Sequence, residues 1–352
     1  MKKRLIGTLL VGTALTLALA AGAGKALAEW VRDMEIDENL ITSALRLELG
    51  SPPEEEKTET EAADVPGEQE SVTTEKKERV KTVPVVVAPP PAPTESESGP
   101  EMKILTAELS ADVDIYNDTS IDVDLKSLAE EEFGLALDRD EPQILIIHTH
   151  SSEAYAQDPY DRYEESDESR TEDKRYSVIR VGDELTEKLG ECGLNVIHDR
   201  DIYDYPSYTG SYNRSGEAVM SYIDKYPSIK IVIDLHRDAI GTGDVIYKTK
   251  AELNGRSCAQ VMLLVGTGEN GLAHPDWREN LKLAVYMQNA MDERYPTLAR
   301  PIALKKERYN QHLTKGSLIL EVGSSGNTLE EALTAIDLFG ETVGPALAKL
   351  VD

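Results

Sequence analysis

The segment Gln143-Ile144-Leu145-Ile146-Ile147-His148-Thr149-His150-Ser151-Ser152-Glu153 joins four branched apolar residues to two histidines and a carboxylate. The apolar run is short and rich in β-branched side chains, and Glu141-Pro142 ahead of it is a break signal, so we predict a buried strand. In an extended chain His148 and His150 point to the same face, and a turn after the strand can bring Glu153 back toward them. Imidazole nitrogens and a carboxylate oxygen are the protein ligands of a catalytic zinc ion. We therefore predict a metal site at the end of this strand.

Segments of strand and helix character alternate along the rest of the second half of the chain. The dipeptide Asn254-Gly255 predicts a tight turn between strands at 245–251 and 258–265. Thr328 followed by Glu331 predicts a capping box at the start of the last helix. The strand-then-helix order predicts an α/β fold with a mostly parallel central sheet and helices on both faces. We expect the main strands at 144–147, 194–197, 229–235 and 317–320, and the main helices at 176–190, 215–226, 277–294 and from 328 onward.

Potential ligands and acid/base groups follow the three most apolar of these strands. His148 and His150 follow the first strand, His236 follows the second, and Glu321 follows the third. Taken singly, a hydrogen-bonded core histidine or an ion-paired glutamate explains each of these residues. Ligands of parallel α/β sheets bind beyond the carboxyl ends of the strands, so the four side chains are expected at one edge of the sheet. Together they favour a metal-dependent hydrolase.

The N-terminus carries the pattern of an export signal. Lys2, Lys3 and Arg4 precede an uncharged run over residues 5–24, which is long enough to span a bilayer. Ala26-Leu27-Ala28 matches a small-x-small cleavage site, so residues 1–28 are either a removable signal peptide or a retained membrane anchor. In both cases the chain after Glu29 is expected outside the cytoplasm. We expect a catalytic domain on the outer side of the cell membrane, or a secreted one if the signal is cleaved.

Composition divides the exported part into three regions. Residues 29–50 suggest a short amphipathic segment, residues 51–100 are an acidic and proline-rich linker that we expect to be disordered, and residues 101–352 form the catalytic domain. The formal net charge of −28 argues against nucleic acid as a partner. Cys192 and Cys258 have no CxxC context, so they are either buried thiols or one disulfide.

Three motifs of this chain together resemble a known family. They are His148-Thr149-His150-Ser151-Ser152-Glu153-Ala154-Tyr155, Asp234-Leu235-His236-Arg237-Asp238-Ala239, and Leu320-Glu321-Val322-Gly323 followed by Asn327-Thr328 and Glu331-Ala332. Their order and spacing resemble the stage II sporulation protein P (SpoIIP) family, from Leu105 to the C-terminus. The resemblance implies a fold like that of the zinc-dependent N-acetylmuramoyl-L-alanine amidases. It also implies peptidoglycan as the substrate, with cleavage of the muramoyl-alanine amide and of peptide cross-links during engulfment of the forespore. The implied partners are a SpoIID-like lytic transglycosylase and a SpoIIM-like membrane protein.

The resemblance also assigns roles to individual residues. It implies that His150 and His236 are the imidazole ligands of Zn²⁺ and that Glu321 is the catalytic carboxylate. Simpler zinc amidases supply the anionic ligand from the start of the first helix, where this chain has Tyr176-Ser177-Val178, so we choose Glu153 instead. His148 then supports a ligand or binds substrate, and it can exchange roles with His150. Arg237 is a candidate for supporting a ligand or for binding substrate, and Asn213 is a candidate for binding substrate, although both can also be ordinary surface groups. His198, His274 and His312 are expected in loops or at their edges.

A mechanism and two competing functions follow from this ligand set. Zinc lowers the pKa of its bound water toward about 7, and Glu321 would act as the general base. Another exported metallohydrolase, acting on carbohydrates or phosphate esters, would use the same ligands. An exported adaptor or binding module with a structural zinc would show no turnover. The acidic run at 158–173 is either a lid over the site or an insertion.

Overall fold

The computed structural model describes residues 101–106, 113–131, 134–242 and 245–352. The predicted signal or anchor at 1–28, the amphipathic segment at 29–50 and the linker at 51–100 lie outside these residues. None of the helices in the described ranges combines the length and the apolar character that crossing a membrane requires.

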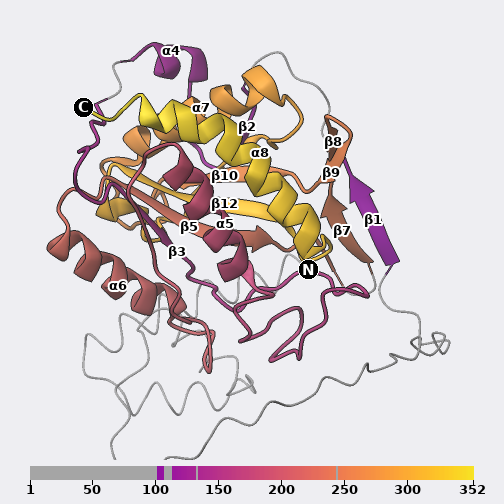
Figure 1. Cartoon of the computed structure of the whole chain (residues 1–352). Helices are drawn as coiled ribbons and strands as arrows, with labels where there is room; N and C mark the ends of the chain where they lie inside the picture. Colours follow the sequence, from indigo (N-terminus) through magenta and orange to yellow (C-terminus); the bar gives the residue numbers. More distant parts are fainter. Residues whose placement is uncertain (1–100, 107–112, 132–133, 243–244) are drawn as a thin grey trace, which may run out of the picture. The chain divides into compact units, whose positions relative to one another are not determined.

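A seven-stranded sheet forms the centre of the fold, with the strand order β2-β11-β10-β12-β5-β3-β4 (Figure 1). Its strands pair in parallel except β10 and β12, which are antiparallel. The predicted mostly parallel sheet is therefore confirmed, although the short strand β11 was not predicted. The strand bounds are β2 (Ile115–Asn117), β3 (Ile144–Ile147), β4 (Val196–His198), β5 (Ile231–Asp238), β10 (Val261–Gly266), β11 (Ile302–Lys305) and β12 (Gly316–Ser324).

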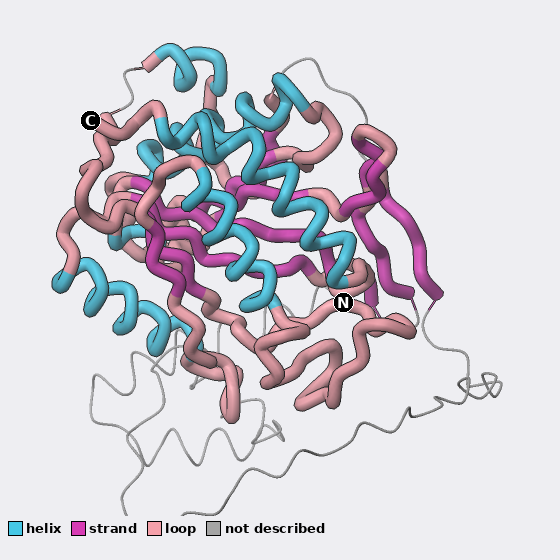
Figure 2. The backbone as a smooth tube through the Cα atoms, viewed as in Figure 1, coloured by secondary structure: helices cyan, strands magenta, loops and turns pink. Residues whose placement is uncertain are grey.

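Helices cover both faces of this sheet. One face carries three helices that pack together, α5 (Val178–Glu191), α7 (Trp277–Arg294) and α8 (Leu329–Ala348). The other face carries α6 (Ser211–Lys225) (Figure 1 and Figure 2). Side chains alternate along β3 and therefore contact the helices on both faces of the sheet. Ile144 and Ile146 join the large core formed with α5, α7 and α8, whereas Leu145 and Ile147 pack with Val219 of α6. The prediction of helices on both faces is confirmed.

Local sequence signals fix where the helices begin. The Thr328 side chain accepts a hydrogen bond from the Glu331 backbone, and the Glu331 side chain accepts one from the Thr328 backbone, so the predicted capping box opens α8. Ser177 caps α5 through its contact with the Ile179 amide. Such caps contribute about 0.5–2 kcal/mol each. A further short helix, α4 (Leu125–Glu130), begins at the capping residue Asp124.

Two smaller sheets accompany the central one. Strand β7 (Val245–Thr249) pairs with β1 (Glu101–Leu105) and β6 (Gly241–Thr242), while β8 (Ala251–Leu253) and β9 (Arg256–Cys258) form a hairpin. Asn254 and Gly255 connect this hairpin with φ of 53° and 75°, the positive pair that a two-residue turn of this kind requires. The predicted tight turn is confirmed, but it joins β8 and β9. The strands predicted at 245–251 and 258–265 correspond to β7 and β10, which lie in different sheets, so the predicted pairing between them is wrong. Cys192 and Cys258 are free thiols, so they do not form a disulfide with each other.

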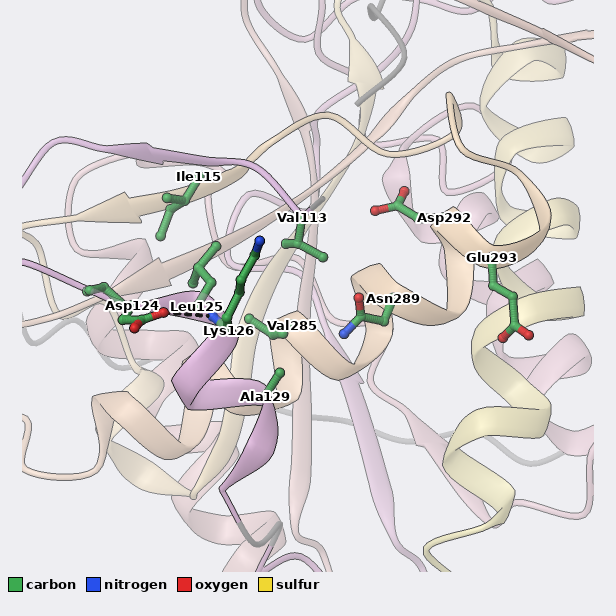
Figure 3. Close-up of a pocket in the computed structure, with 11 residues that line it drawn as sticks. Val113, Ile115, Asp124, Leu125, Lys126, Ala129, Val285, Asn289, Asp292 and Glu293 are labelled. Atoms are coloured by element: carbon green, nitrogen blue, oxygen red, sulfur yellow. Dashed lines mark hydrogen bonds between the residues drawn. The ribbon is translucent and has the colours of Figure 1, made fainter. Parts of the chain in front are cut away.

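A cavity of about 790 Å³ lies between the β2 region, α4 and α7 (Figure 3). Its lining includes the apolar side chains of Val113, Leu125 and Val285 and the carboxylate of Asp292. Burial raises the pKa of Asp292 from its ordinary value of 3.8 to about 6. The unfolded chain therefore loses this proton at a lower pH than the folded chain does. The folded state loses stability on this account as the pH rises from about 4 to 6.

Replacing Asp292 with asparagine should increase the free energy of unfolding at pH 8 by about 1 kcal/mol, a figure reduced for the partial exposure of the group. At pH 4 the gain should be much smaller, because the folded protein then holds the proton. Urea denaturation of the wild type and the variant at both pH values measures this difference. The exposed neighbour Glu293, changed to glutamine, is the control. An equal gain for Asp292→Asn at both pH values contradicts the argument.

Candidate active site

Two of the predicted site residues lie side by side on neighbouring strands in the middle of the sheet. His236 of β5 and Glu321 of β12 are partners in the parallel register, so their side chains leave the sheet on the same face. That face is the one that α6 covers, because Leu235 and Leu320 next to them point into the opposite core. Both residues lie within strands rather than after them, and the register becomes irregular between Glu321 and Ser324.

His150 reaches the same place from the turn after β3. Its Nδ1 atom lies 3.4 Å from Ser211 Oγ, at the start of α6, and its Nε2 atom lies 3.0 Å from the Tyr208 hydroxyl. Its ring stands edge to face with the ring of His236, with the centroids 5.2 Å apart. The two predicted imidazole ligands are therefore direct neighbours.

Glu153 completes the group of predicted ligands. Its Oε2 atom lies 3.4 Å from His236 Nδ1 and accepts a hydrogen bond of 3.2 Å from the Arg237 backbone N–H. Arg170 approaches its other oxygen at 3.6 Å. Burial by itself opposes the charge, but His236 and Arg237 outweigh burial and lower the pKa of Glu153 to about 2. Glu153 is thus an ionised carboxylate beside His236.

His236 is held between two carboxylates. Its Nε2 atom lies 2.9 Å from Asp234 Oδ1 in a geometry that makes no good hydrogen bond, and its Nδ1 atom faces Glu153. Burial disfavours the imidazolium, yet Asp234 and Glu153 together raise the pKa of His236 well above its usual value. Asp234 is itself fixed by the backbone N–H and the hydroxyl of Thr149, at 2.7 and 2.6 Å. The surroundings of His236 therefore favour a positive charge.

Glu321 differs from the other carboxylates of the site. Its Oε2 atom is buried and has no hydrogen-bond partner among the residues that the structure describes. Burial raises the pKa of Glu321 to about 8, and the nearby charge of Glu153 acts in the same direction. Without an additional positive charge, Glu321 is mostly protonated at neutral pH. A cation bound nearby would favour the ionised form that a general base needs.

The side chains of this site are of the types that bind a metal ion, but in the structure they are not arranged around a common point. Within the described ranges, no three His, Cys, Asp or Glu side chains are arranged so that they could hold a metal. His150, His236 and Glu153 nevertheless lie in contact, in the combination of two imidazoles and a carboxylate that zinc prefers. The unpartnered Oε2 of Glu321 and the carboxylates around His236 also suit a cation. Zinc stays a prediction, one that requires these side chains to rearrange around the ion.

The predicted placement of His148 is wrong. His148 is fully buried, with Nδ1 2.9 Å from the Leu235 carbonyl and Nε2 2.8 Å from His198 Nε2. Strand β3 ends at Ile147, so the alternation that put His148 and His150 on one face does not continue through the turn. The ring packs instead against Gly182 of α5, where an added Cβ would lie 2.7 Å from His148 Nε2. His148 and His150 therefore do not share a strand face, and the role of His148 in supporting a ligand stays a prediction.

Arg237, predicted to support a ligand or to bind substrate, is bonded to the segment that carries Glu153. The residue is 6% exposed, and its guanidinium donates to the carbonyls of Ala154 and Ser169, each at 2.9 Å. It ties the segment after β3 to β5, while its backbone N–H holds Glu153. Asn213 is exposed on the first turn of α6. Of the histidines expected in loops or at their edges, His274 lies in a loop and His198 is the last residue of β4, as expected, whereas His312 lies in a short 3-10 helix. His274 is buried, so it is not a surface group.

Several residues around the site were not predicted. The position of Asp234 could have been predicted, because it lies two residues before His236 and therefore on the same strand face. Tyr208 and Ser211 follow β4 in the sequence, and no residue pattern connects them to His150. Arg170 belongs to the acidic run at 158–173, and its guanidinium bonds with Asp204 and lies 5.0 Å above the Tyr208 ring. Part of the acidic run therefore lies directly against the site.

The chain matches a known protein family over most of its length. The family model for stage II sporulation protein P (SpoIIP) matches residues 26–344. The chain belongs to the SpoIIP family. A curated member, stage II sporulation protein P of Bacillus subtilis (strain 168), is 30% identical over 217 residues, which are 57% of this chain and 51% of that protein. The chain thus spans about half the length of this curated SpoIIP protein.

Among solved structures, amidases are similar to part of this chain. The N-acetylmuramoyl-L-alanine amidase AmiC2 of Nostoc punctiforme is 12% identical, with a TM-score of 0.34, over 59% of this chain and 96% of the amidase. The catalytic domain of CwlV, an N-acetylmuramoyl-L-alanine amidase from Bacillus (Paenibacillus) polymyxa var. colistinus, is 11% identical, with a TM-score of 0.36, over 59% and 97% of the two chains. With TM-scores below 0.5, neither likeness indicates what this SpoIIP-family chain does.

Proposed function

We propose that this protein is a zinc-dependent peptidoglycan hydrolase, an N-acetylmuramoyl-L-alanine amidase that acts on the cell wall during sporulation engulfment. The observation that carries the proposal is that His150 and Glu153 both contact His236, beside Glu321, whose buried Oε2 has no partner among the described residues. Membership of the SpoIIP family supports the cell-wall substrate. Hydrolysis of an amide needs a group that accepts a proton from water and a group that stabilises the charge developing on the carbonyl, and this site offers residues for both tasks.

The residues divide the work as follows. His150, His236 and Glu153 would hold Zn²⁺, which when bound supplies Lewis-acid activation of water and of the scissile carbonyl. Glu321 takes a proton from the attacking water and returns it to the leaving nitrogen. Asp234 orients His236 through its contact with Nε2. Arg237 fixes the position of Glu153 through its backbone N–H.

The wider setting forms part of the same proposal. Peptide cross-links are a second class of bond that the enzyme would cut, in addition to the muramoyl-alanine amide. We place the catalytic domain outside the cytoplasm, attached through residues 1–28 if these are retained. Its expected partners are a SpoIID-like lytic transglycosylase, which would cut glycan strands of the same polymer, and a SpoIIM-like membrane protein.

Mass spectrometry of the products tests the proposal directly. The full chain is incubated with purified peptidoglycan, with and without a zinc chelator, and the released muropeptides are identified. Free stem peptides that disappear with chelator support the amidase, and separated cross-links support the endopeptidase activity. Turnover of carbohydrate or phosphate esters alone favours another exported metallohydrolase. Tightly bound zinc without any turnover favours the adaptor with a structural metal.

A further inference from the structure

Both ring nitrogens of His150 already have partners in the protein. Ser211 Oγ lies 3.4 Å from Nδ1, and the Tyr208 hydroxyl lies 3.0 Å from Nε2. Both partners are hydroxyl groups that can donate or accept, so the two contacts are compatible with either tautomer of His150. In the tautomer with a proton on Nδ1, the ring donates to Ser211 and accepts the Tyr208 proton at Nε2. A histidine that binds a metal commonly donates a hydrogen bond from one ring nitrogen and places the lone pair of the other nitrogen on the metal. In that tautomer the Tyr208 hydroxyl contacts the nitrogen of His150 that would bind the metal.

The Tyr208 ring is also stacked in place. It lies nearly parallel to the His150 ring, at an angle of 12° and a centroid distance of 4.4 Å. Arg170 lies 5.0 Å from its centroid and is bonded to Asp204. Asp204 in turn accepts hydrogen bonds from the backbone and hydroxyl of Ser152. The hydroxyl contact is therefore part of a connected set of loop residues around His150.

Tyr208 lies at the surface, so displacing its side chain would not disturb the core. The residue is 57% exposed, whereas His150 is only 7% exposed. Moving the tyrosine away from Nε2 costs a hydrogen bond and a stacking contact but opens no part of the buried core. A change at Tyr208 can thus alter the availability of His150 without unfolding the sheet.

We propose that Tyr208 is a positioning residue of the metal site: its hydroxyl competes with the metal ion for Nε2 of His150, and its ring holds the imidazole plane. This inference rests on the proposed function, in which His150 binds zinc. Tyr208 accordingly sets the affinity of the site for its metal. Metal binding and the Tyr208–His150 hydrogen bond exclude each other.

Zinc affinity of the full chain tests this competition. Competition with a chromophoric chelator gives the Kd of the wild type, of Tyr208→Phe, and of Tyr160→Phe as a control at a tyrosine that is 91% exposed. Because Tyr208→Phe removes only the hydroxyl and keeps the ring, it should bind zinc about three- to tenfold more tightly, the range expected for one lost hydrogen bond. The control should match the wild type. Unchanged or weaker affinity of Tyr208→Phe, while the wild type binds zinc, overturns the competition and leaves the proposed function standing.

A measurement without metal checks the same contact. Diethyl pyrocarbonate acylates imidazole nitrogens, and peptide mass spectrometry measures its rate at His150 in the chelator-treated protein. Tyr208→Phe should be acylated at His150 several-fold faster than the wild type, because Nε2 is then no longer hydrogen bonded. Equal rates overturn the inference. If no variant binds zinc, the competition fails together with the metal of the proposed function, whatever the acylation rate.

Discussion

Replacing Glu321 with glutamine should slow amide cleavage by at least about 100-fold while the protein keeps its fold and its zinc. A general base typically contributes a factor of about 100 to 10,000, and an amide of the same shape cannot accept the proton. The fold should survive because burial raises the pKa of Glu321 to about 8, so the site already accommodates a neutral side chain in the absence of metal. Its buried Oε2 also has no partner, among the described residues, that the substitution would remove.

Three measurements on the Glu321→Gln protein separate the possible roles: metal content, thermal unfolding, and the rate of muropeptide release. The matched variant is Glu153→Gln, which changes the other buried glutamate of the site. If Glu321→Gln loses its zinc, Glu321 is the anionic ligand, and Glu153→Gln should then retain the metal. If both variants bind zinc and cleave at the normal rate, the hydrolase mechanism is wrong and the adaptor function becomes the better one.

Replacing His236 with alanine should abolish zinc binding and activity, and it should also destabilise the metal-free protein. Its imidazolium lies between Asp234 and Glu153, so its removal takes away the ion-pair partner of Asp234 and leaves Glu153 with Arg170, which is 3.6 Å away. Breaking a buried ion pair in this way costs about 3–5 kcal/mol. His150→Ala should abolish zinc binding equally but cost less stability, because burial lowers the pKa of His150 to about 4 and its ring is neutral at pH 7.

Elemental analysis of the purified full-length proteins gives the zinc content, and urea denaturation at pH 7 in the presence of chelator gives the stability. The pair of variants serves as its own control, since both remove an imidazole from the same site. Full activity of either variant rules out that histidine as a ligand. A loss of stability that is equal in the two variants contradicts the charge assignment of His236.

The sequence predicted the parts of this site that belong to strands. Long apolar runs located β3, β5 and β12, and the parallel arrangement then required His236 and Glu321 to meet. The period of two residues along a strand explains why Asp234 lies on the same face as His236. Register and pleat are regular features, so residue spacing translates directly into position.

The parts of the site that belong to turns were not predictable in this way. After Ile147 the chain leaves the extended conformation, so His148 turns toward His198 while His150 turns toward His236. The approach of Tyr208 to His150 depends on the path of an irregular segment, for which sequence offers no period. Strand β11 was also missed, because its sequence Ile-Ala-Leu-Lys lacks the four consecutive branched apolar residues that identified β3.

The reversal of chain direction between β10 and β12 limits the length of polymer that the sheet itself can contact. Only β4, β3, β5 and β12 present their carboxyl ends at the edge with the site, and at about 4.8 Å per strand these four span about 14 Å. A glycan strand with its stem peptides extends far beyond that width. If the proposed function holds, the sheet would therefore contact one short stretch of the polymer, and any preference for a longer pattern along the wall would have to come from loops such as residues 158–173 or from a second protein bound to the same strand.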